Sequence, residues 1–137
     1  LPITVSPIIT HGLLWQNTPA FSLYPGGYDE ISLTSDFKVA MPDSEKLYSP
    51  EELGFARCRE ADLYGGDTPE EAAAIFDRVL QGTATPAQSN CVIANAAFAI
   101  RVMRPEKSID TCIAEARESL AAGKALHTFE KFVELNS

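Results

Sequence analysis

Two adjacent carboxylates are the residues of this sequence whose types and spacing best suit metal binding. Asp29 and Glu30 lie in the stretch GGYDEISLT, after the glycine pair Gly26-Gly27 and before an alternating apolar segment. Neighbouring side chains point to opposite faces of a regular strand, whereas a turn can bring them together. Mg²⁺ prefers oxygen ligands and is commonly held by one or two carboxylates plus substrate phosphates. On spacing alone, a polar surface turn is the stronger interpretation of the pair and a magnesium site is the alternative.

A second glycine pair precedes a predicted helix and suggests an anion site. Gly65-Gly66-Asp67-Thr68 would place backbone amides of a helix N-terminus next to a bound anion. The segment has neither the Lys-Ser/Thr pair of a Walker loop nor a GxGxxG pattern. Asp67 would also repel a phosphate, so we expect a structural helix cap here.

The histidines and cysteines do not form a recognisable reactive group. His127 lies among charged residues of a predicted helix and is expected on the surface, and His11 has no assigned role. Cys58, Cys91 and Cys112 have no zinc-binding spacing, so we expect reduced, packed thiols in a reducing compartment. No G-x-S-x-G or other nucleophile motif is present, and no catalytic residue is assigned.

The first half of the chain must position the carboxylate pair through strands and turns. Ile31–Thr34 alternates apolar and polar residues, which predicts a half-buried strand directly after Glu30. Phe37–Met41 is the next strand candidate, followed by a turn at 42–44. Further short strand candidates are Ile3–Val5, Ile8–Thr10, Phe21–Tyr24 and Lys46–Tyr48.

The second half carries helix signals. Capping boxes begin at Ser49, Thr68 and Thr85, each with Pro at the first helical position and Glu or Gln at the third. The helix after Thr85 is apolar nearly all round, which predicts a central, buried helix. Its Asn90 and Asn95 are expected to bond to backbone or to a neighbouring element. The predicted helices run from Thr68 to about Gln81, from Thr85 to Arg104, from Ser108 to Gly123, and onward from Lys124.

Composition limits the fold and the partners. A chain of 137 residues with 45% hydrophobic and 22% charged residues is typical of one soluble domain, here residues 1–137. The net charge of −8, without a dense basic run, argues against nucleic acid as a partner. Prolines interrupt the apolar residues 1–24, so no membrane span is expected. We predict an α/β fold in which a small mixed β-sheet from the N-terminal half packs with four or five C-terminal helices.

Several segments, taken in order, resemble the C-terminal part of the anthranilate phosphoribosyltransferase family. They are GYDEISLTSDFKV, the following PEELG, GGDTPEEAAAIFDRVLQG, NCVIANAAFAI and ESLAAGKALHTFEKFVEL. The likeness covers about residues 26–137, whereas residues 1–25 match poorly. It implies a partial version of the family's α/β domain, a fold shared with class II nucleoside phosphorylases.

The resemblance also implies a function. The family transfers a phosphoribosyl group from phosphoribosyl pyrophosphate (PRPP) to anthranilate, a cytoplasmic, Mg²⁺-dependent step of tryptophan biosynthesis. Its magnesium-binding Asp-Glu pair matches Asp29 and Glu30. PRPP and anthranilate are thus the expected ligands of the intact parent enzyme, with no nucleic acid and no membrane.

This sequence departs from the family's pattern in what it lacks. The Gly-Thr-Gly-Gly-Asp loop, the Lys-His-Gly-Asn segment, the arginine that contacts anthranilate and the N-terminal helical domain are absent. Substrate positioning contributes about 7–11 kcal/mol to such catalysis. We therefore expect a C-terminal fragment, natural or truncated, that binds Mg²⁺ weakly and is inactive alone. The alternatives are a non-catalytic interaction module that self-associates through exposed apolar helices, and a nucleoside-phosphorylase-type enzyme, which the short length disfavours.

Overall fold

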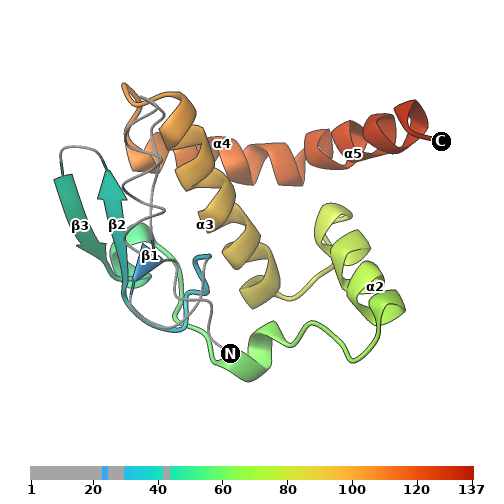
Figure 1. The fold of residues 1–137 in the computed structure, drawn as a ribbon, viewed down its shortest axis with the longest axis horizontal. Helices are drawn as coiled ribbons and strands as arrows, with labels where there is room; N and C mark the ends of the chain where they lie inside the picture. The colour runs from blue at the N-terminus through green and yellow to red at the C-terminus, as the bar shows by residue number, and fades with distance from the viewer. Residues whose placement is uncertain (1–22, 25–29, 42–43) are drawn as a thin grey trace, which may run out of the picture.

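A three-stranded antiparallel sheet forms one side of the structure (Figure 1). The computed structural model describes residues 23–24, 30–41 and 44–137. The strands are β1 (Leu23–Tyr24), β2 (Phe37–Met41) and β3 (Ser44–Tyr48), in the order β1-β2-β3. Phe37 pairs with Tyr48 and Met41 with Ser44, as in a hairpin. The strand candidates Ile3–Val5 and Ile8–Thr10, together with His11 and Asp29, lie outside the described residues.

Two expectations about the sheet are wrong for the described residues. All of their strand pairings are antiparallel, so this sheet is not mixed. Ile31–Thr34 is a bent loop and not a strand, although Ile31 and Leu33 are buried and Ser32 and Thr34 only half-buried, as the alternation predicted. The predicted periodicity of burial is right, but the backbone of this segment bonds to side chains and to the backbone amide of Cys58, and not to a neighbouring strand.

The predicted capping residues begin the helices. Thr68, Thr85 and Ser108 each accept a hydrogen bond from the third backbone amide of the helix that follows. The elements are the 3₁₀ helices η1 (Glu51–Leu53) and η2 (Glu60–Leu63) and the α-helices α2 (Pro69–Leu80), α3 (Pro86–Met103), α4 (Ile109–Ala121) and α5 (Lys124–Leu135). The α/β class with four C-terminal α-helices is therefore confirmed.

The first capping box produces only a short helix. Ser49 and Glu52 exchange the expected bonds, with Glu52 N donating to Ser49 Oγ at 3.2 Å and Ser49 N to Glu52 Oε2 at 3.5 Å. The helix ends after three residues because Gly54 takes a left-handed φ of 75°, a conformation that glycine adopts without strain.

Helix α3 occupies the centre of the structure, between the sheet and α2, and packs against α4 (Figure 1). The buried core is drawn from the loop at 31–33, β2, the segment around η1, α3 and α4. Phe37 of β2, Tyr48 of β3 and Phe98 of α3 form an aromatic cluster with ring centroids 5.4 to 5.9 Å apart. The core residues are Ile31, Leu33, Phe37, Val39, Leu53, Phe55, Ile93, Ala94, Ala97, Phe98, Cys112, Ile113 and Ala116.

The burial of α3 is one-sided among the described residues. Ala94 and Ala97 are fully buried, which lets neighbouring elements approach the helix closely. Val92 and Met103, in contrast, are 46% and 80% exposed. The prediction of a central helix is confirmed, and its predicted burial holds for one side of the helix only. No helix in the described part of the chain is both long and apolar enough to cross a bilayer.

Candidate functional site

Glu30 is the member of the predicted metal pair that the structure describes, and it is exposed. Its carboxylate takes part in no ion pair with the described residues, and residues 30–41 and 44–137 contain no cluster of three metal-ligating side chains. Asp29 lies outside the described residues, so the convergence of the two carboxylates stays a prediction. An exposed carboxylate without a cationic partner is the kind of oxygen donor that Mg²⁺ takes.

The residue after Glu30 is held by a side chain of α3. Ile31 N donates to Asn95 Oδ1 at 3.0 Å, and Asn95 Nδ2 donates to Ile31 O at 2.8 Å. The same Nδ2 also donates to Cys91 O, one helical turn earlier, at 2.8 Å. The Asn95 amide therefore satisfies both backbone groups of Ile31, whose side chain is 1% exposed.

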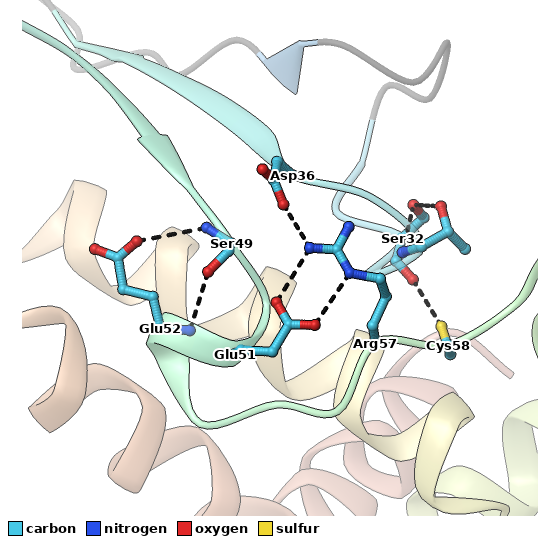
Figure 2. A network of polar contacts seen from close by, with 8 residues as sticks. Ser32, Asp36, Ser49, Glu51, Glu52, Arg57 and Cys58 are labelled. Carbon is cyan, nitrogen blue, oxygen red and sulfur yellow. Dashed lines mark hydrogen bonds and ion pairs between the residues drawn. The ribbon is translucent and has the colours of Figure 1, made fainter.

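Two thiols hold the next residue of the loop. Cys91 Sγ donates to Ser32 O at 2.8 Å, and Cys58 Sγ donates to the same oxygen at 3.3 Å (Figure 2 shows the Cys58 contact). Burial raises the pKa of Cys91 to about 12, with the neighbouring Cys58 and the charge of Glu30 as smaller causes. Because a thiolate is the nucleophilic form, this protonated thiol is a hydrogen-bond donor and not a reactive group.

The loop also contains a strained residue. Leu33 has φ 60°, the one positive value among the described non-glycine residues, and its side chain is 1% exposed. This conformation costs an L-residue about 1–2 kcal/mol. The contacts around it offset that cost, since Cys58 N donates to Leu33 O at 3.1 Å and Ser32 Oγ bonds Thr34 Oγ1 at 2.7 Å.

An arginine ties the far end of the loop to η1. Arg57 Nη2 donates to Asp36 Oδ1 at 2.5 Å, and Arg57 Nε donates to Glu51 Oε1 at 3.0 Å (Figure 2). A second bond from Nη2 to Glu51 Oε2, at 3.1 Å, makes the Arg57–Glu51 pair bidentate. The guanidinium lowers the pKa of Glu51, and the two carboxylates raise that of Arg57. The loop from residue 30 to 36 is therefore fixed at both ends, with Glu30 projecting from the first.

The other described candidates from the sequence are a helix cap, a contact between helices and an exposed side chain. Asp67 N donates to Glu71 Oε2 at 2.7 Å, so the glutamate already occupies the N-terminus of α2 that an anion would need. Gly66 has φ 89°, and a Cβ there would lie 2.6 Å from Glu71 Cβ. His127 is exposed on α5, and Asn90 Oδ1 accepts from Arg117 Nη1 at 3.3 Å.

A cleft of about 770 Å³ lies between α3, α4 and α5, away from the loop. Its charged lining residues pair with one another: Glu115 with Arg104 at 3.6 Å, and Glu118 with Lys124 at 2.5 Å. Such paired charges leave little free charge for a ligand. Its lining residues are Ala99, Ile100, Met103, Arg104, Glu115, Glu118, Ser119 and Lys124.

The sequence could not identify the hydrogen-bond partners of Asn95, Cys58 and Cys91. An asparagine within an apolar helix signals a buried polar partner. The partner is 64 residues away in the chain, so no local pattern identifies it. The loop's own alternation pointed to a strand instead.

Comparisons with known proteins point to one family. The family described as "Glycosyl transferase family, a/b domain" matches residues 15–126. The chain is 68% identical over 110 residues to an anthranilate phosphoribosyltransferase of Bacteroides fragilis (strain YCH46), which is 80% of this chain and 33% of that protein. It is 36% identical over 132 residues to an anthranilate phosphoribosyltransferase of Flavobacterium johnsoniae, which is 92% of this chain and 39% of that protein. The chain thus spans about a third of the length of the curated relatives it matches.

Solved structures agree with this similarity. The anthranilate phosphoribosyltransferase of Thermus thermophilus superposes with a TM-score of 0.82 at 27% identity, over 94% of this chain and 40% of that chain. The Saccharomyces cerevisiae enzyme in complex with PRPP and Mg gives a TM-score of 0.77 at 20% identity, over 90% of this chain and 35% of that chain. The second likeness concerns the fold alone.

Proposed function

The chain belongs to the family described as "Glycosyl transferase family, a/b domain". We propose that it is part of an anthranilate phosphoribosyltransferase-like catalytic domain. The observation that carries the proposal is the exposed carboxylate of Glu30 at the start of a loop anchored to α3, in a chain 68% identical to an enzyme of that name. Within the parent enzyme, the reaction is the transfer of a phosphoribosyl group from PRPP to anthranilate, in tryptophan biosynthesis. We place it in the cytoplasm, a location with which three free thiols are compatible.

Asp29 and Glu30 are the residues proposed to hold Mg²⁺. Exposed carboxylates suit this ion, and Glu30 has no described cationic partner to compete with it. When bound, Mg²⁺ neutralises negative charge on the pyrophosphate group of PRPP. This chain's contribution is to hold the loop that begins at Glu30 in a fixed position, through the contacts of Asn95 with Ile31. Two carboxylates without a phosphate ligand bind the ion weakly, so the chain alone is expected to lack turnover.

The test is a chimera made with the Bacteroides fragilis relative. The 110 matched residues of that enzyme are replaced by those of this chain, and turnover is followed by the loss of anthranilate fluorescence with PRPP and Mg²⁺. We expect the chimera to be active and the 137-residue chain alone to be inactive. An inactive chimera that folds as the parent does would contradict the proposed function. Turnover by the chain alone, abolished by Asp29→Ala, would contradict its expected inactivity.

A second candidate is a non-catalytic interaction module derived from the same fold. It is favoured by the apolar side chains that α3 and α5 leave exposed: Val92 at 46%, Phe132 at 62% and Leu135 at 75%. Self-association of the chain would support it, and the chimera separates the two candidates because a pure interaction module would not restore turnover.

A further inference from the structure

We propose that Asn95 is the positioning residue for the Glu30 carboxylate, an inference that rests on the proposed function. Asn95 is not itself proposed as a ligand of the metal or the substrate. Its side-chain amide fixes the backbone of Ile31, which directly follows Glu30. It therefore determines the point on the loop from which the Glu30 side chain extends.

The contact between Asn95 and Ile31 replaces a strand pairing. Ile31 N and O have no backbone partner among the described residues, and the side chain of Asn95 supplies both the acceptor and the donor. A buried amide and carbonyl left without partners would cost about 1–3 kcal/mol each. The backbone at Ile31 is therefore held in this orientation by one side chain.

Asn95 is itself held rigidly. It lies in the middle of the 18-residue helix α3, beside the fully buried Ala94. The additional bond from Asn95 Nδ2 to Cys91 O, at 2.8 Å, fixes the direction of the amide. Because the Cα atoms of consecutive residues lie about 3.8 Å apart, a fixed Ile31 confines Glu30 to a small volume.

The thiol contacts support this arrangement but act one residue further along. Cys91 and Cys58 bond to Ser32 O, and the strained Leu33 follows. They hold the body of the loop, whereas Asn95 holds the residue bonded to Glu30. Residues that orient metal ligands typically change metal affinity by about 10- to 100-fold when they are mutated. Because Asn95 acts through the backbone, we expect the lower end of that range.

The experiment uses the ¹⁵N-labelled 137-residue chain and MnCl₂, because Mn²⁺ binds carboxylates as Mg²⁺ does and broadens nearby amide signals. Paramagnetic broadening also detects binding that is too weak for calorimetry. In the wild-type chain we expect selective broadening of the Ile31 amide, which Glu30→Gln removes. In Asn95→Ala, about tenfold more Mn²⁺ should be needed for the same broadening. The matched control is Asn90→Ala on the same helix, whose amide contacts Arg117 and not the loop.

The outcomes distinguish this proposal from the proposed function. Wild-type broadening that is unchanged in a folded Asn95→Ala chain overturns the positioning role and leaves the metal pair intact. The absence of selective broadening in the wild type overturns the metal pair, and the positioning role with it. If Asn95→Ala does not fold, Asn95→Gln keeps an amide but displaces it by one methylene. It should still weaken the Mn²⁺ response, and an unchanged response in that variant overturns the proposal.

Discussion

At the scale of single residues, the loop from 30 to 36 depends on side chains that bond to its backbone. The side chain of Asn95 forms hydrogen bonds with both the backbone amide and the carbonyl of Ile31, and the thiols of Cys91 and Cys58 both donate to the carbonyl of Ser32. Local alternation in sequence located the buried positions, Ile31 and Leu33, but could not identify these partners. For the carboxylates Asp29 and Glu30, spacing alone favoured a polar surface turn, and only the family resemblance indicated a magnesium pair.

The state of Cys91 leads to a prediction about its reactivity. Its pKa is raised to about 12, chiefly by burial, so the thiolate that attacks alkylating agents is scarce near neutral pH. We expect Cys91 in the folded chain to react with iodoacetamide at about pH 8 far more slowly than in denaturant, as measured by peptide mass spectrometry. Equal rates with and without denaturant would contradict a half-buried, protonated donor.

The ion pair of η2 predicts a pH dependence. Hydrogen bonds from the Arg59 side chain and from Arg59 N lower the pKa of Asp62 from 3.8 to about 2. A lowered pKa stabilises the fold above the unfolded value, and this contribution is lost as the pH falls from about 4 to about 2. Thermal unfolding should therefore show a higher Tm for the wild type than for Asp62→Asn at about pH 6, and the difference should shrink as the pH falls toward about 2.

Because the pair is exposed, salt should reduce this Tm difference. Asp77→Asn, an exposed aspartate on α2, serves as the control and should show no such trend. A difference between wild type and Asp62→Asn that persists unchanged at about pH 2 would rule out the ionised pair as its source.

At the scale of elements, helix starts were predictable and the loop was not. A Ser or Thr followed by Pro and Glu or Gln satisfies the first amides of a helix with residues that are neighbours in sequence. The starts of α2 and α3 therefore follow from short local motifs. Ile31–Thr34 has the same alternation as a strand, and only contacts with α3 and Cys58 decide that it bends.

The N-terminal capping box of α3 can be tested for its contribution to stability. Thr85 Oγ1 accepts from Gln88 N at 3.3 Å, and Gln88 Oε1 accepts from Thr85 N at 3.2 Å. Thr85→Ala should lower the free energy of unfolding by about 1 kcal/mol, as measured by urea denaturation. Thr128→Ala, an exposed threonine within α5, is the matched control, and an equal effect at both sites would argue against a capping role.

At the scale of the whole molecule, the described residues leave apolar helix surface exposed. Phe132, Val133 and Leu135 of α5 are 62%, 46% and 75% exposed. The chain spans about a third of the length of the named relatives. Exposed apolar side chains in this number favour association with another surface. Exposed apolar helices are what the interaction-module alternative expected from the sequence.

This exposure predicts self-association of the 137-residue chain. Light scattering after size-exclusion chromatography should show a mass that rises with protein concentration, and Phe132→Glu should reduce that rise. Lys131→Glu on the same helix changes the charge without removing an apolar side chain and should have a smaller effect. A constant monomer mass at all concentrations would contradict the prediction.

The central claim, that this chain supplies the magnesium-binding carboxylates of a phosphoribosyltransferase, is tested most directly by the Mg²⁺ dependence of the chimera. The measurement is kcat/KM for PRPP as a function of Mg²⁺ concentration, for the chimera and for its Glu30→Gln and Glu45→Gln forms. Glu45 is the control because it is an exposed glutamate paired with Lys38 on the sheet. We predict a loss of about 100-fold for Glu30→Gln, partly recovered at high Mg²⁺, and little change for Glu45→Gln. Equal activity and equal Mg²⁺ dependence in all three proteins would contradict the claim.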